Sequence, residues 1–102
     1  MRIFENAIIL VNMEEIRAII SGRVQMVMFR DFTKRAARRL GIKGFVKNRA
    51  DGTVEVVARG QREALAKLIE RIHHGSLLSR VDSVQVETSG RSEEFTNFDI
   101  KF

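Results

Sequence analysis

The sequence predicts a single α+β domain of two layers, in which two helices cover one face of a mainly antiparallel sheet. Two observations lead to this prediction. Segments with strand periodicity and segments with helix periodicity follow one another in the order β-α-β-β-α-β, and a short strand ends the chain. The 102 residues are 44% hydrophobic, which suffices for one buried core and is typical of one domain.

The first half of the chain is predicted to contain a strand, a helix and a hairpin. The strand ends at Gly22, and apolar residues at helical spacing follow until Gly41, a residue suited to ending a helix. The pair Asp51-Gly52 is a strong signal for a tight turn between two strands. The expected bounds are 15–21 for the first strand, about 29–40 for the helix, and 42–49 and 53–59 for the hairpin strands.

The second half repeats the succession of helix and strand. Leu65, Leu68, Ile69 and Ile72 form an apolar stripe, and Gly75 ends the helix that carries it. The expected bounds are about 61–74 for this helix, 81–88 for the fourth strand and 95–102 for the terminal strand. Helices and strands in this order are typical of the ferredoxin-like βαββαβ sandwich.

The composition excludes several kinds of site. Without any cysteine the chain has no disulfide, no thiolate metal site and no cysteine nucleophile, which fits a reducing, cytoplasmic location. His73 and His74 are neighbours on a helix and do not share a face, so we expect no metal site there. No apolar run is long enough to cross a membrane, and we expect no membrane partner.

The charge predicts an affinity for anions. The net charge is +5 and the isoelectric point is about 10.4. Few aromatic residues accompany the basic ones, so a solvated helix face or a small anion is favoured over nucleic acid, whose bases need stacking partners. The basic cluster comprises Arg30, Lys34, Arg35, Arg38, Arg39, Lys43, Lys47 and Arg49.

The segment from Ser21 to Arg30 has the features of an anion site. A strand leads through a glycine-containing loop into the start of a helix, where N–H groups lack intrahelical partners and the helix dipole is positive. Arg30 could add a full charge and a planar fork for a phosphate. From these residues alone, an ordinary connection with a solvated arginine is the favoured alternative.

Three strings in this sequence resemble the acylphosphatase family. The family pattern G-x-V-Q-G-V-x-F-R matches Gly22 to Arg30 at every fixed position but one. The strings Gly44-Phe45-Val46-Lys47-Asn48 and Asp51 to Gly60 follow in the family's order and spacing, and the segment 95–102 is family-like as well. The resemblance covers about residues 14–102, which would form an acylphosphatase-like domain after an N-terminal extension of residues 1–13.

The resemblance implies hydrolysis of the carboxyl-phosphate bond of acyl phosphates, without metal, cofactor or covalent intermediate. Arg30 occupies the position that binds the phosphate, and Asn48 occupies the position that orients the attacking water. Inorganic phosphate or sulfate is the ligand expected at the same site. The loop that would cradle the phosphoryl oxygens comprises Gly22, Arg23, Val24, Gln25, Met26 and Val27.

Two of these residues have a purely structural alternative, and one departs from the family pattern. Asn48 could be a turn residue of the hairpin, and Gln25 could brace the loop without chemistry. The family glycine at the centre of the loop is Met26 here, and at positive φ a methionine costs about 1–2 kcal/mol. We expect the loop to form nevertheless, since its N–H groups remain.

Two other functions compete with catalysis. A weakened acylphosphatase-like domain could serve as an anion-binding module because of Met26. A ferredoxin-like RNA-binding domain is less favoured, because residues 53–59 contain no aromatic side chain.

The two ends of the chain carry separate expectations. Residues 1–12 could form an edge strand, a helical turn or an extended start, and they could mediate a dimer of a protein otherwise expected to be a monomer. In the terminal strand, Phe98, Ile100 and Phe102 are expected to share one apolar face.

Overall fold

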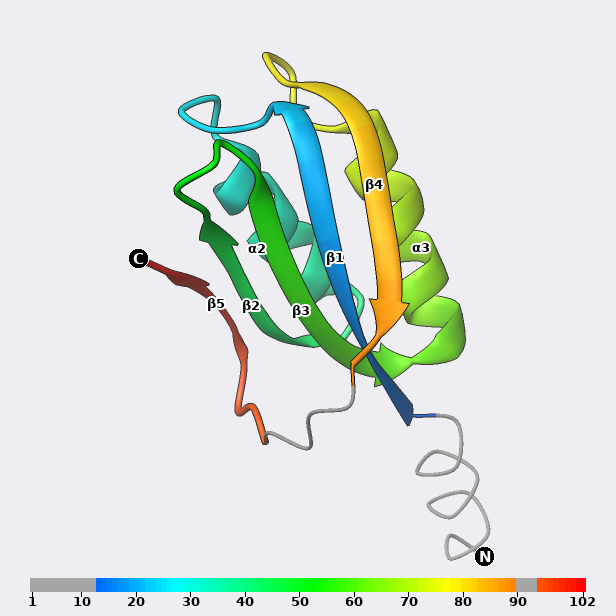
Figure 1. Cartoon of the computed structure of the whole chain (residues 1–102). Coiled ribbons are helices and arrows are strands. Elements are labelled where there is room, and N and C mark those ends of the chain that lie inside the picture. Colours follow the sequence, from blue (N-terminus) through cyan, green and yellow to red (C-terminus); the bar gives the residue numbers. More distant parts are fainter. Residues whose placement is uncertain (1–12, 90–93) are drawn as a thin grey trace, which may run out of the picture.

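A computed structural model describes residues 13–89 and 94–102, so residues 1–12 of the predicted extension of residues 1–13 lie outside the described residues. The chain forms a sheet with two helices on one face (Figure 1). No helix within the described ranges has the length and apolar character needed to span a membrane. The elements are β1 (Met13–Arg23), α2 (Phe29–Arg39), β2 (Lys43–Asn48), β3 (Val54–Gln61), α3 (Arg62–His74), β4 (Arg80–Thr88) and β5 (Phe98–Lys101).

The sheet confirms the predicted ferredoxin-like topology. Its strand order is β4-β1-β3-β2-β5, and all neighbours are antiparallel except β2 and β5, which run parallel. Helix α2 packs over β2 and β5, whereas α3 packs over β3 and β4. The helices therefore share one face of the sheet and leave the other face open (Figure 1).

The core lies between the sheet and the helices, as the alternation of apolar residues predicts. Every second residue of β1 and β3 points toward the helices, and these side chains are fully or almost fully buried. The predicted stripe of α3 meets them, with Leu65, Leu68 and Ile72 buried and Ile69 partly so. The sheet residues in this core are Ile16, Ala18, Ile20, Val54, Val56 and Ala58.

Two strands differ from the expected length by more than two residues. Strand β1 continues past Ser21 because a bulge at Ser21/Gly22 keeps it paired with β4. Gly22 allows this close pairing, since a Cβ there would lie 2.1 Å from the carbonyl oxygen of Arg80. Strand β5 is shorter than predicted, because Phe95 packs against the ring of Phe45 with centroids 6.2 Å apart instead of extending the strand.

Gly44 provides a test of the packing between β2 and β3. Its φ is +143°, and a Cβ would lie 1.9 Å from the carbonyl oxygen of Val57. Gly44→Ala should lower the free energy of unfolding by about 2–3 kcal/mol. Gly41→Ala is the matched control, because Gly41 also has positive φ but no atom would lie within 4 Å of the new Cβ. Gly41→Ala should lower the free energy of unfolding by only about 1 kcal/mol. Equal losses for the two variants in urea unfolding would contradict the role of the close approach between Gly44 and Val57.

Candidate active site

Three connections meet at the end of the sandwich where β1 ends and α2 begins (Figure 1). They are the β1–α2 loop of residues 24–28, the hairpin turn of residues 49–53 and the α3–β4 connection of residues 75–79. The structure assigns Gly22 and Arg23, two of the expected loop residues, to the last positions of β1. The other four, from Val24 to Val27, lie in the loop itself.

The β1–α2 loop contains left-handed residues, a backbone feature of anion-binding nests. Met26 and Met28 both have a φ of 62°, in the left-handed region that non-glycine residues seldom adopt. Left-handed residues at alternate positions turn successive N–H groups toward one concave side. Within the described ranges, no backbone hydrogen bond of a loop or turn uses an N–H group of residues 24–28. These donors are therefore available to a ligand.

The departure at Met26 falls where the conformation is most demanding. The predicted positive φ is present, so the methionine carries the backbone strain expected there. Its side chain is 99% exposed and fills no part of the protein interior. The substitution thus changes the energy of the loop, while the N–H group of residue 26 is retained.

Side chains hold the loop from both sides. The Gln25 amide nitrogen donates hydrogen bonds to the carbonyl oxygens of Arg49 and Thr53, at 2.8 and 2.9 Å. Gln25 therefore braces the loop against the hairpin turn. On the other side, the Ser76 hydroxyl donates to the carbonyl oxygen of Val27 at 3.0 Å. The loop is fixed between the hairpin turn and the α3–β4 connection.

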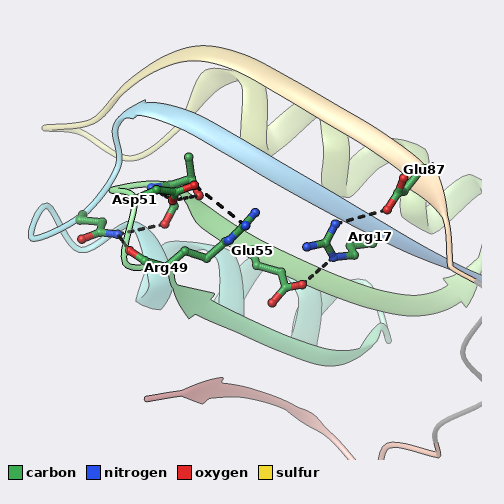
Figure 2. A network of polar contacts seen from close by, with 7 residues as sticks. Arg17, Arg49, Asp51, Glu55 and Glu87 are labelled. Carbon is green, nitrogen blue, oxygen red and sulfur yellow. Dashed lines mark hydrogen bonds and ion pairs between the residues drawn. The ribbon is translucent and has the colours of Figure 1, made fainter.

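The hairpin turn has its own support, which Figure 2 shows. The Asp51 carboxylate accepts hydrogen bonds from the hydroxyl and the backbone N–H of Thr53, at 2.6 and 3.0 Å, and lies 3.9 Å from the Arg49 guanidinium. These donors, the hydroxyl first, lower the pKa of Asp51 below its ordinary value. These hydrogen bonds stabilise the folded state fully above the pKa of an unfolded aspartate. This stabilisation is lost as the pH falls through the lowered pKa of Asp51.

Arg30 is the second residue of α2, at the positive end of the helix dipole. Its guanidinium carbon lies 5.0 Å from the ring centroid of Phe102, a cation–π distance. Within the described ranges Arg30 has no acidic partner, so its charge is not neutralised by an ion pair. Phe102, expected on the apolar face of the last strand, is instead 93% exposed beside this arginine.

Asn48 is the last residue of β2 and shares a strand face with Val46, the face that the helices cover. Its Oδ1 atom is buried and accepts no hydrogen bond from any group in the described part of the chain. Asn48 also pairs with Val54 across the hairpin. A buried amide oxygen without a protein partner is suited to bind a water molecule or a ligand donor.

The open face of the sheet does not offer a surface for stacking nucleic-acid bases. Arg17 occupies its centre in ion pairs with Glu55 at 2.6 Å and Glu87 at 3.3 Å (Figure 2). Phe45 is only 4% exposed, because Phe95 and the Lys101 ammonium group, 4.0 Å from the ring centroid, cover it. The RNA-binding alternative is not supported by this arrangement.

Comparison with known proteins identifies the family. The family model described as "Acylphosphatase" matches residues 16–100. The chain belongs to the acylphosphatase family. The acylphosphatase of Salinibacter ruber is 43% identical over 88 residues, covering 86% of this chain and 93% of that protein. The acylphosphatase of Methanococcoides burtonii is 45% identical over 82 residues, covering 80% and 85% of the two chains.

Solved acylphosphatases have the same fold. The crystal structure of the Bacillus subtilis enzyme superimposes with a TM-score of 0.83 at 39% identity, covering 86% of this chain and 98% of that one. An acylphosphatase from Coxiella burnetii gives a TM-score of 0.86 at 32% identity, with coverages of 91% and 97%. The structural and sequence comparisons therefore agree with the family resemblance of the three strings.

Two residues at this acylphosphatase-like site were not found from the sequence. Ser76 anchors the β1–α2 loop, and Phe102 lies against Arg30. A serine after a helix-ending glycine and a terminal aromatic residue are common features of surfaces, so neither carries a local signal. Only the packing of α3–β4 and β5 beside the loop gives them a role.

Gln25 tests whether the loop depends on the hairpin. Gln25→Ala removes the two hydrogen bonds, while both carbonyl oxygens keep a backbone donor, Gly52 N–H for Arg49 and Arg49 N–H for Thr53. The free energy of unfolding should fall by only about 1 kcal/mol. The dissociation constant for inorganic phosphate, measured by calorimetry, should rise at least about tenfold. Gln85→Ala, on β4, is the control; an unchanged constant in Gln25→Ala would contradict the bracing role.

Position 26 tests the strain in the loop. A β-branched residue tolerates positive φ worse than methionine does, so Met26→Val should lower the free energy of unfolding by about 1–2 kcal/mol. Met26→Gly relieves the strain but gains freedom in the unfolded chain, and these effects should offset to within about 1 kcal/mol. Thermal and urea unfolding of the wild type and the two variants would measure these differences in the free energy of unfolding. A valine variant as stable as wild type would mean that residue 26 leaves the left-handed region.

Proposed function

We propose that the protein hydrolyses the carboxyl-phosphate bond of acyl phosphates, with Arg30 and the β1–α2 loop binding the phosphoryl group and Asn48 orienting the water. Family membership supports the reaction. The observation that carries the residue roles is the buried Oδ1 of Asn48, which lacks a protein partner at the end of the sheet where the loop and Arg30 lie. A purely structural turn residue would be expected to use this oxygen.

Phosphate binding requires positive charge and several donors held in place. The donors of the β1–α2 loop and the first turn of α2 supply fixed partial charges, and Arg30 adds a full charge with a planar fork. The ring of Phe102 restricts the movement of the Arg30 side chain without neutralising its charge. Because these groups are already positioned, they stabilise charge on the phosphoryl oxygens without reorganising during the reaction.

Water activation requires placement more than proton removal. Asn48 can accept a hydrogen bond from a water at Oδ1, which fixes one lone pair of that water toward phosphorus. An amide is a poor base, and a strong base is unnecessary when the leaving group is a carboxylate. The water oxygen forms a bond to phosphorus, the bond to the acyl oxygen breaks, and the carboxylate leaves with the electron pair. The water proton passes to the phosphate product or to solvent.

Hydrolysis of benzoyl phosphate in the presence of EDTA tests the proposal. Arg30→Gln should lower kcat/KM about 10³-fold, because it removes the charge that holds the phosphoryl group. Asn48→Ala should lower kcat about 10²-fold with a smaller change in KM, because the water is less well oriented. The reaction is followed by ultraviolet absorbance, since the chain has no Trp or Tyr.

Two matched controls accompany these variants. Arg62→Gln removes an arginine that pairs with Glu14 at the start of α3, and Lys47→Ala alters the neighbour of Asn48 on the opposite strand face. Both should retain wild-type rates within about twofold. A fully folded wild type without turnover would favour the alternative of an anion-binding module, and recovery of activity in Met26→Gly would then assign the loss to Met26. Activity abolished by EDTA would contradict the metal-free mechanism.

The remaining statements about ligands, oligomeric state and location stay predictions. Inorganic phosphate or sulfate is expected to occupy the loop as a competitive ligand. A monomer, a cytoplasmic location and the absence of any cofactor are likewise predicted from the composition and the family pattern. The alternative of a dimer through residues 1–12 concerns residues outside the described ranges.

A further inference from the structure

Four exposed apolar side chains belong to the β1–α2 loop and to the α3–β4 connection that is bonded to it. Met26, Met28, Leu77 and Leu78 expose 99%, 70%, 98% and 67% of their surface, and we call these residues the apolar rim. They account for four of the six exposed large hydrophobic residues in the described ranges. Single exposed apolar residues are ordinary, whereas a group of them next to a binding site indicates a contact surface.

Leu77 and Leu78 of the apolar rim lie on the opposite side of the loop from Asn48. Gln25 ties the loop to the hairpin turn that follows Asn48, whereas Ser76 ties Val27 to the connection that carries Leu77 and Leu78. Figure 1 shows the same order of segments at this end of the sandwich. A phosphoryl group bound to the loop would therefore have the hairpin on one side and the apolar rim on the other.

The direction of the reaction connects this arrangement with the substrate. In an in-line displacement, the leaving group departs on the side of phosphorus opposite the attacking water. With the water at Asn48, the acyl oxygen points away from the hairpin, toward the apolar rim. We propose that the apolar rim binds the acyl chain and that the protein prefers acyl phosphates with an apolar chain of several carbons. This inference rests on the proposed hydrolysis of acyl phosphates.

A hollow between α2 and α3 continues the apolar rim. Asp31 at its near end pairs with Arg35 at 3.0 Å and Lys34 at 3.7 Å, so this end carries no unpaired cation for an anionic chain. Phe32 and Ala36 add apolar atoms to the lining of this hollow. The full lining is Met28, Asp31, Phe32, Arg35, Ala36, Arg39, Arg71, Ser76 and Leu77. Because Arg39 and Arg71 also belong to it, a chain ending in a carboxylate is the competing substrate class.

The test compares acetyl, butyryl, hexanoyl and succinyl phosphate with the wild-type protein. The leaving carboxylates of the first three have nearly the same basicity, so differences in kcat/KM report binding of the chain. We expect kcat/KM to rise about twofold to fourfold for each added methylene, because its removal from water changes an equilibrium constant by about fourfold. Succinyl phosphate should react more slowly than butyryl phosphate, which has the same number of carbons.

The double variant Leu77→Ser, Leu78→Ser tests the apolar rim directly. Its ratio of kcat/KM for hexanoyl over acetyl phosphate should fall at least about tenfold relative to wild type. Val86→Thr is the matched control, since Val86 is an exposed apolar residue of β4 outside the apolar rim, and its ratio should equal that of wild type. Circular dichroism and the inhibition constant for inorganic phosphate report whether the variants are folded with an intact loop.

Several results would overturn the inference. Equal kcat/KM for the three alkanoyl phosphates, or a ratio unchanged in the double variant, would show that the apolar rim does not contact the chain while hydrolysis itself stands. A preference for succinyl over butyryl phosphate would assign the hollow to anionic chains. A dimer of the wild type that dissociates in the double variant, with no chain-length preference in either, would assign the apolar rim to a second copy. If none of the four acyl phosphates were hydrolysed, the proposed function would be contradicted as well.

Discussion

The register of three neighbouring strands determines where the site forms. Val54 pairs with Ile20 of β1 on one side and with Asn48 of β2 on the other. The end of β1, from which the loop departs, therefore lies in the same row of the sheet as Asn48. Ile20 and Val54 are completely buried, so a slip of one residue would expose both and would turn Asn48 to the open face. Core packing thus fixes the position of the site.

The β1–α2 loop joins this rigid sheet to α2 at the expense of backbone strain. Two methionines adopt a conformation that costs on the order of 1 kcal/mol each. The hydrogen bonds from Gln25 and Ser76 act on the same short segment, and each contributes a similar amount. The energy of the backbone strain and the energy of these hydrogen bonds are therefore comparable. The loop keeps its conformation because the hairpin turn and the α3–β4 connection both hold it. A loop anchored on one side only would relax toward ordinary φ values.

Much of this arrangement follows from local signals in the sequence. Apolar periodicity predicts both helices, and Asp51-Gly52 predicts the hairpin, because these features depend on neighbouring residues. The family strings predict Arg30 and Asn48 as site residues. The extension of β1 through Arg23 and the late start of the last strand, at Phe98 instead of Phe95, depend on contacts between distant segments. The contact of Phe102 with Arg30 has the same origin, whereas the alternation of residues in the last strand predicts only that Phe102 shares a face with Phe98 and Ile100.

Met26 illustrates how a departure from a family pattern can be separated into its effects. The chemistry proposed for the loop uses an N–H group, and methionine retains it. The conformation that glycine adopts without strain is kept, at a cost that the flanking hydrogen bonds can offset. What remains is a long, flexible and almost fully exposed apolar side chain at the edge of the site. A substitution that changes neither donors nor fold, but adds apolar surface beside the leaving group, acts on substrate choice more directly than on the chemical step.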